Sequence, residues 1–234
     1  MSCDDPATVK QQYATENKLR ARQGMYEEST GPDAHDVLWQ TLVAWRPRRV
    51  LEVGGGPGEL SERMQKELGA QVSFLDVSPR MVELARARGV DARLGDVQAL
   101  PFEDSVFDTV VAAWMLYHVA DIDLGLAEIA RVLRPGGALV AVTNSVLHLS
   151  ELRELIAYPR GYEETFNREN GEGFLRPHFV VVERLDLEVE VTVRDREKLV
   201  AYQQSLLVET QPVPEDVELP FIAHARVSIF VAMT

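Results

Sequence analysis

The sequence has a single cysteine, few basic residues and no long hydrophobic stretch. Because Cys3 has no second cysteine to pair with, an internal disulfide and a zinc site of the Cys-x-x-Cys type are both excluded. The longest apolar run, Val110 to Tyr117, is far shorter than the ~20 residues that a membrane-spanning helix needs. The first 15 residues are polar and carry no apolar signal core. We therefore expect a cytoplasmic protein that does not bind membranes.

Positive charge is scarce, because 24 Lys and Arg residues stand against 37 Asp and Glu residues, for a net charge of -13. Such a field repels phosphates and disfavours a nucleic-acid partner. The five histidines do not cluster with carboxylates at metal-ligand spacing, so no metal site is predicted. With 46% hydrophobic residues, the 234-residue chain can still bury a sizeable core. We expect a small-molecule partner and a monomer or homodimer.

Apolar runs alternate with helical patterns between about residues 48 and 143. Leu60, Met64 and Leu68, for example, recur at the spacing of one helix face. Such alternation predicts an α/β fold with a parallel sheet covered on both faces. The five runs predicted as strands are 49–53, 71–75, 90–94, 107–113 and 138–143.

Outside this region the pattern loosens. We expect an N-terminal helical extension or cap over residues 1–35, with a helix from about 8 to 26, and one domain over 36–234. Within that domain, a ligand-binding core would occupy 48–143 and an inserted lid, carrying substrate contacts, about 144–182. The remaining expected elements are helical segments at 149–156, 174–179 and 196–207 and strands at 180–193 and 226–232.

The glycine-rich segment after the first predicted strand has two readings. As the dinucleotide fingerprint G-x-G-x-x-G it ends on Glu59, where close packing requires Gly or Ala, and this disfavours a nicotinamide enzyme. The second reading, E-x-G-x-G-x-G, is complete with Glu52, Gly54, Gly56 and Gly58. In this reading, backbone amides at the helix start favour a modest anion such as a carboxylate, and the acid of Glu52 favours an amino group or a sulfonium. The alternative to a ligand site is a plain tight turn.

Two further acids follow the next predicted strands. Asp76 ends the second strand, where a carboxylate can accept both hydroxyls of a ribose. Asp96 ends the third, where it can accept from an adenine amino group. Ligands of such sheets bind at the carboxyl ends of the strands, so the set indicates an adenosine joined to an amino acid. The alternatives are a helix cap at Asp76 and a turn residue at Asp96.

Over residues 48–143 the chain resembles a class I S-adenosylmethionine-dependent methyltransferase of the small-molecule type, with a methyltransferase-11-like domain. The resemblance implies a Rossmann-like doubly wound sheet, mostly parallel with an antiparallel last strand. It also implies S-adenosyl-L-methionine as cofactor, S-adenosyl-L-homocysteine as product, and no metal. The segments that carry it, in family order, are Val50–Gly58, Asp76, Gly95–Phe102, Phe107–Val119 and Arg131–Gly137.

The same resemblance implies which residues contact the cofactor. From the N-terminal extension, Tyr13 and Arg22 are candidates to close over it. Those implied for the methionine part are Glu52, Gly54, Gly56, Ala113 and Trp114. Those implied for the adenosine are Asp76 at the ribose, Asp96 and Val97 at the adenine, and Met81 packed on it, and Gly55, Gly58 and Val77 are further candidate cofactor contacts.

Methyl transfer from a sulfonium is an in-line displacement with an activated donor, so the protein mainly aligns the reactants and excludes water. A base is needed only for a weak nucleophile. His118 is the candidate for a general base or substrate contact, and a structural histidine is the alternative. The candidate substrate-binding residues are Tyr117, Asn144, His148, Tyr158 and His178.

The predicted function is methyl transfer from S-adenosylmethionine to a small molecule, with the accepting atom (O, N or C) left open. One alternative is methylation of RNA or protein, although the net charge of -13 weighs against RNA. The other alternative is a module that binds S-adenosylmethionine without catalysis.

Overall fold

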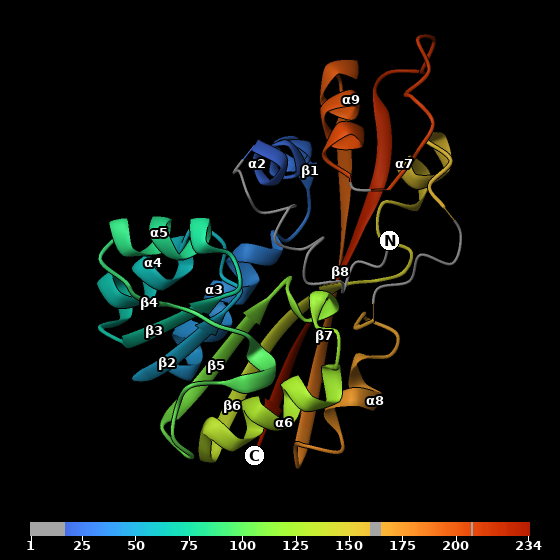
Figure 1. Ribbon diagram of the computed structural model, residues 1–234. Coiled ribbons are helices and arrows are strands. Elements are labelled where there is room, and N and C mark those ends of the chain that lie inside the picture. The colour runs from blue at the N-terminus through green and yellow to red at the C-terminus, as the bar shows by residue number, and fades with distance from the viewer. Residues whose placement is uncertain (1–16, 160–164, 207) are drawn as a thin grey trace.

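The computed structural model describes residues 17–159, 165–206 and 208–234, in which eight strands form one sheet (Figure 1). The strand order is β1-β7-β8-β6-β5-β2-β3-β4. The strands are β1 Ser29–Thr30, β2 Arg49–Val53, β3 Gln71–Asp76, β4 Asp91–Leu94, β5 Phe107–Ala113, β6 Leu133–Asn144, β7 Val181–Val193 and β8 Phe221–Met233.

Strands β6, β5, β2, β3 and β4 run parallel to one another, whereas β8 pairs antiparallel with both β6 and β7. Because β8 is the last strand of the chain, the predicted antiparallel last strand is confirmed. The short β1 pairs antiparallel with β7 at the edge. The sheet is the doubly wound, mostly parallel Rossmann-like type that the sequence indicates.

Helices cover both faces of the sheet. Side chains of α3 and α4 share one apolar cluster with β2, β5 and β6, and those of α5 pack on β3 and β4. Side chains of α6 and α8 share a cluster with the opposite face. The helices are α2 Asn17–Gln23, α3 Ala34–Trp45, α4 Glu59–Leu68, α5 Pro79–Ala87, α6 Ile122–Val132, α7 Ser150–Leu155, α8 Gly171–Leu175 and α9 Arg196–Ser205, with 3-10 turns η1 Gly24–Tyr26, η2 Val97–Ala99 and η3 Leu116–His118.

Local sequence signals explain where several elements begin and end. Helix α5 begins after Ser78, whose side chain accepts the N–H of Met81, and Pro79 takes the first helical position. The side chain of Asp121 caps α6 in the same way. Residues 107–112 of the central strand β5 are all buried, as a strand covered on both faces requires.

The structure differs from the predicted elements in several places. The helix expected over 174–179 is α8 at Gly171–Leu175, and the strand expected over 226–232 already begins at Phe221 in β8. Helix α3 and strand β1 were not predicted, and α3 spans the expected boundary between residues 35 and 36. The described part of the helix expected over 8–26 is α2 followed by η1. The strand predicted over 138–143 begins earlier, because residues 134–137 lie within β6 as an irregularity where pairing jumps from Phe107–Leu133 to Thr109–Ala138.

A second, smaller core lies beyond the carboxyl ends of the parallel strands. Strands β7 and β8 are 13 residues each and extend past β6 into this region, where α2, α7 and α9 surround them (Figure 1). We call this region the upper lobe. Its core consists of Met25, Leu149, Leu152, Ile156, Val189, Val191, Val193, Leu199, Tyr202, Val213, Ala223 and Ala225.

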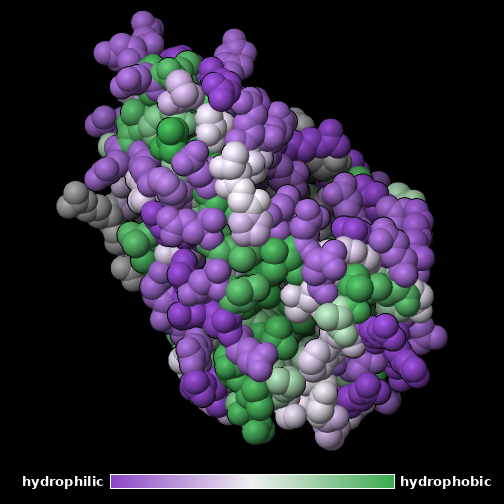
Figure 2. Space-filling model, turned by 180° about the vertical axis from the view of Figure 1, so that it is seen from behind, coloured by the Kyte–Doolittle hydropathy of each residue, from purple (hydrophilic) through white to green (hydrophobic). Residues whose placement is uncertain are grey.

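Polar side chains cover much of the surface, and seen from behind a band of hydrophobic side chains crosses it (Figure 2). Exposed large hydrophobic residues include Val181 and Leu185 of β7 and Ile222 of β8. Among the residues that the structure describes, no helix combines the length and apolar character needed to cross a membrane.

Asp108 ties the start of β2 to the start of β5. Its carboxylate is buried and accepts the backbone N–H groups of Arg48 and Arg49 at 3.0–3.2 Å, and Arg134 lies 3.7 Å away. Replacing it by alanine leaves these donors without their acceptor. We expect Asp108→Ala to lower the free energy of unfolding by about 2 kcal/mol or more, measured by urea denaturation.

Asp108→Asn is the matched control, because the amide keeps one acceptor oxygen. It should lower the free energy of unfolding less than the alanine variant does. An alanine variant as stable as the wild type would show that these hydrogen bonds do not hold the two strands together.

Candidate active site

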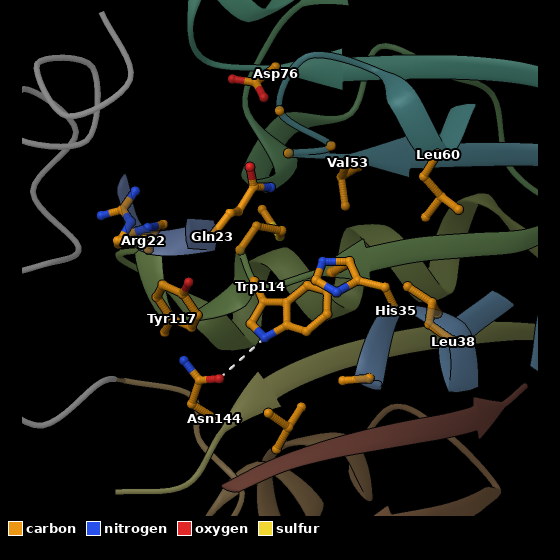
Figure 3. Close-up of a pocket in the computed structure, with 18 of the residues that line it drawn as sticks. Arg22, Gln23, His35, Leu38, Val53, Leu60, Asp76, Trp114, Tyr117 and Asn144 are labelled. Carbon is orange, nitrogen blue, oxygen red and sulfur yellow. Dashed lines mark hydrogen bonds between the residues drawn. The ribbon is translucent and has the colours of Figure 1, made fainter. Parts of the chain in front are cut away.

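A cavity of about 800 Å³ lies between the carboxyl ends of the parallel strands and the upper lobe (Figure 3). Residues at the ends of four strands line it, namely Val53, Asp76, Ala113 and Asn144. Val189 of β7, with other residues of the upper lobe, forms the opposite wall. The volume falls in the range typical of sites for small molecules and cofactors.

The glycine turn between β2 and α4 brings bare backbone to the cavity. Gly54 and Gly56 have φ values of 63° and 57°, which glycine adopts without cost. A Cβ atom on Gly54 would lie 2.7 Å from Cβ of Met115, and one on Gly55 would lie 2.3 Å from Cδ of Glu52. Side chains are therefore excluded from this turn, and all three glycines line the cavity.

Glu52 lies beneath this turn, with 1% of its surface exposed. The hydroxyl of Ser61, on α4, donates a hydrogen bond to its carboxylate. Burial raises the pKa of Glu52 to about 7, although the bond from Ser61 opposes the shift and the charge of Asp76 adds to it. The carboxylate thus has a strong preference for a cationic neighbour, because a positive charge would offset the cost of its ionisation.

Two acids stand at the ends of neighbouring strands along one side of the cavity. Asp76 ends β3 and accepts the backbone N–H of Ser78 at 2.8 Å, and burial raises its pKa to about 6. Asp96 follows β4 and accepts both the backbone and the side-chain N–H of Gln98, at 2.9 and 3.0 Å. The side-chain oxygen of Gln98 in turn accepts the N–H of Asp121, which fixes this loop.

Trp114 lies near the middle of the cavity, between Asp76 and Asn144 in Figure 3. Its φ of 53° is rare for a residue other than glycine, and such backbone strain is concentrated at functional sites. The indole Nε1–H donates to Asn144 Oδ1 at 3.2 Å, and the ring of His35 lies 4.5 Å away at 31°. Strand β5, strand β6 and helix α3 thus fix this side chain together.

A hydrogen-bonded pair lies in the part of the cavity next to the upper lobe. The hydroxyl oxygen of Tyr26 is 2.9 Å from Nε2 of the buried His148. Burial raises the pKa of Tyr26 above its ordinary value and lowers that of His148 to about 3, the latter with help from the charge of Arg153. Both groups are therefore neutral at physiological pH.

His118 and Tyr117 line the cavity from η3, directly after β5. Their rings pack edge to face with centroids 4.5 Å apart. Tyr158 lines it from the segment after α7, with the guanidinium of Arg153 5.0 Å from its ring centroid.

Most of the site residues named from the sequence line this one cavity, but three do not. Gly58 has a φ of 80° and packs α4 on Ala85. Met81 is buried with 1% exposed, and His178 lies 2.8 Å from Asp123, outside the cavity. Tyr13 lies outside the described residues. Those that line the cavity are Arg22, Glu52, Gly54, Gly55, Gly56, Asp76, Val77, Asp96, Val97, Ala113, Trp114, Tyr117, His118, Asn144, His148 and Tyr158.

Several lining residues were missed from the sequence. Gln98 lies inside the motif Gly95–Phe102, and its position next to Asp96 is the signal that could have revealed it. Tyr26, His35, Arg153 and Tyr202 belong to elements outside the strand–helix alternation, and no sequence pattern ties them to the site. Within the described parts of the chain, no group of three or more His, Cys, Asp or Glu side chains could hold a metal ion.

Fold and site together define a class of protein. A glycine turn after the first parallel strand, an acid ending the next and another acid beyond it surround one cavity at the carboxyl ends. This is the arrangement of the class I S-adenosylmethionine-dependent methyltransferases. A family model described as a methyltransferase domain matches residues 51–141. The chain therefore contains a class I methyltransferase domain.

Curated relatives share this domain. Demethylmenaquinone methyltransferase of Thermus thermophilus is 39% identical over 103 residues, which are 41% of this chain and 47% of that protein. Malonyl-[acyl-carrier protein] O-methyltransferase of Salmonella typhimurium is 32% identical over 154 residues, which are 64% of this chain and 59% of that protein. The chain thus spans about half the length of the curated relatives it matches.

A solved structure shares this fold. The phosphoethanolamine N-methyltransferase 2 of Haemonchus contortus, in complex with phosphomonomethylethanolamine and S-adenosylhomocysteine, superposes with a TM-score of 0.65. The match covers 100% of this chain and 60% of that one, with 19% sequence identity.

The raised pKa of Glu52 makes stability depend on pH. Its folded pKa of about 7 lies above the ordinary value of 4.5, so unfolding releases a proton between these two values. The free energy of unfolding should therefore fall as pH rises through this window, by up to about 3 kcal/mol. Urea denaturation at pH 5 and pH 8 measures the loss.

Glu52→Gln cannot ionise and should lose less stability between these two pH values than the wild type does. The raised pKa of Asp76 acts in the same direction in both proteins, so the difference between them isolates Glu52. Equal losses in the two proteins would contradict the assignment.

Proposed function

We propose that the protein transfers a methyl group from S-adenosylmethionine to a small-molecule acceptor by in-line displacement. The observation that carries this proposal is the convergence of the glycine turn, Glu52, Asp76 and Asp96 on one cavity, within the segment that the methyltransferase family model matches. When bound, S-adenosylmethionine supplies a methyl group already activated on a sulfonium.

The residues present fit that cofactor. The glycine turn lines the cavity with backbone that carries no side chain, so the turn can approach a ligand closely. The buried acid of Glu52 favours the positive charge of an amino group or sulfonium. Asp76 would accept the ribose hydroxyls, and Asp96 would accept from the adenine amino group. Ala113 and Trp114 would line the methionine side, and Arg22 would cover the cofactor.

The acceptor would enter from the upper lobe, whose residues line the same cavity as Trp114 and Asn144. Binding between the sheet and this lobe would align the two reactants and displace water from between them. His118 and Tyr117 lie on this side of the strand ends as candidate acceptor contacts, and His118 is the candidate base. An acceptor that loses its proton only after methyl transfer would need no general base.

A small molecule is favoured over RNA because the chain carries a net charge of -13. The names of the relatives, which act on demethylmenaquinone and on a malonyl group carried by a protein, support acceptors of modest size. A module that binds the cofactor without catalysis is the second reading, and release of S-adenosylhomocysteine above the acceptor-free rate would eliminate it.

The role of Asp76 gives the sharpest test of the cofactor site. Asp76→Ala removes the acceptor of two ribose hydroxyls and should weaken S-adenosylhomocysteine binding by roughly 1–3 kcal/mol. Isothermal titration calorimetry at pH 7.5 measures the change, because the carboxylate is ionised above its pKa of about 6.

Asp91→Ala is the control, because this acid is exposed on the neighbouring strand and does not line the cavity. Its affinity should equal that of the wild type. Absence of any binding to the wild-type protein would overturn the proposed function, and an unchanged affinity in Asp76→Ala would overturn the ribose contact.

A further inference from the structure

The pair of Tyr26 and His148 has no role in the cofactor contacts described above, although both side chains line the cavity. Tyr26 comes from η1, near the start of the described chain, and His148 from the segment between β6 and α7. Their hydrogen bond of 2.9 Å joins residues 122 positions apart. Such a buried polar contact in a ligand cavity commonly orients one group toward the ligand.

The backbone of β8 decides which way the hydrogen bond runs. Nδ1 of His148 lies 3.1 Å from the backbone N–H of Arg226, which donates to it. The carbonyl of Arg226 also lies 3.2 Å from this nitrogen and accepts the N–H of Ser145 at 2.9 Å. Because an N–H can donate only to a nitrogen that carries a lone pair, we assign Nδ1 as the acceptor, which places the hydrogen of the neutral ring on Nε2, where it is donated to the oxygen of Tyr26. The hydroxyl hydrogen of Tyr26 is then left to donate elsewhere.

Three charged or titratable side chains that line the cavity act on this hydroxyl. Tyr202 adds to the rise in the pKa of Tyr26, whereas the positive charges of Arg153 and Arg22 oppose it. Nη1 of Arg153 donates to the carbonyl of Val146 at 3.2 Å, which holds the guanidinium at the cavity wall. The acid closest in sequence, Glu27, is paired with Lys198 at 2.7 Å.

Apolar side chains of the neighbouring elements also line the cavity. They are Val189 on β7, Ala225 and Val227 on β8, and Leu206 and Val208 after α9. The chemistry on offer is thus a hydroxyl donor and guanidinium donors at one end of an apolar chamber. A ligand that fits carries an acidic oxygen on an apolar body.

We propose that this chamber binds the methyl acceptor through an acidic oxygen, held by the Tyr26 hydroxyl and the Arg153 guanidinium, with its apolar body against β7 and β8. The oxygen belongs to a carboxylate or to an ionised phenol. His148 is a positioning residue, because it acts through Tyr26. This inference rests on the proposed function only in naming the ligand as the methyl acceptor, since the chamber's chemistry stands without it.

Three probes with the same body test the proposal: 4-nitrobenzoate, 4-nitrophenol at pH 8.5, and the neutral 4-nitrobenzyl alcohol. Calorimetry with and without saturating S-adenosylhomocysteine gives their dissociation constants. We expect at least one acidic probe to bind roughly tenfold more tightly than the alcohol, because charge-assisted hydrogen bonds are the strong ones. Which acid binds better distinguishes the carboxylate from the phenolate.

Tyr26→Phe and Arg153→Gln should each weaken binding of the acidic probe far more than binding of the alcohol and so remove most of this preference, a pattern that mere loss of folding cannot produce. Arg194→Gln is the matched control, because Arg194 lies in the same lobe, pairs with Glu28 on the surface and does not line the cavity. It should keep the preference.

The proposal is overturned if neither acid binds more tightly than the alcohol, if no probe binds, or if the preference survives in both variants. Acid binding without S-adenosylhomocysteine binding would instead count against the methyl donor and leave the chamber's specificity standing. Binding of S-adenosylhomocysteine without a preference for the acidic probes would overturn the proposed acceptor site and leave the methyl donor site standing.

Discussion

The site depends on one close approach, that of the Glu52 carboxylate to the backbone of the turn above it. The acid lies under Gly55, held by Ser61, and no side chain fits at that glycine. Gly54 and Gly56 turn the chain in the left-handed region, which leads from the end of β2 into α4. This turn leaves open the space that a ligand would fill, and the buried acid gives that space a preference for positive charge.

The two cores of the molecule are coupled through the same pair of strands. The lower parts of β7 and β8 complete the sheet beside β6, and their upper parts form the core of the upper lobe. The backbone N–H of Arg226 on β8 sets the hydrogen bond between His148 and Tyr26. Both walls of the cavity are therefore parts of one continuous sheet, which fixes the distance between the proposed donor and acceptor ends.

Much of the parallel part of the sheet, with the helices that cover it, follows from local sequence signals. The buried run of β5, the capping Ser78 and the glycine turn each act over a few residues, and the acids Asp76 and Asp96 sit where parallel strands end. Helix α3 had readable signals in the capping Asp33 and the apolar face that includes Leu38 and Leu42, yet it interrupts no alternating pattern and was not predicted.

The upper lobe could not be predicted, because its contacts join distant parts of the chain. Tyr26 meets His148 only because β7 and β8 bring η1 and the segment after β6 together. Met81 and Gly58 show the reverse limit, since their positions in the motifs do not reveal that both face helix packing rather than the cavity.

The most direct test of the account is a crystal structure with S-adenosylhomocysteine. The account predicts ribose hydroxyls at the carboxylate of Asp76, adenine beside Asp96, and the sulfur near Trp114 with open space beyond it toward Tyr26 and His148. A ligand bound elsewhere, or one in this cavity with its ribose away from Asp76, would contradict it.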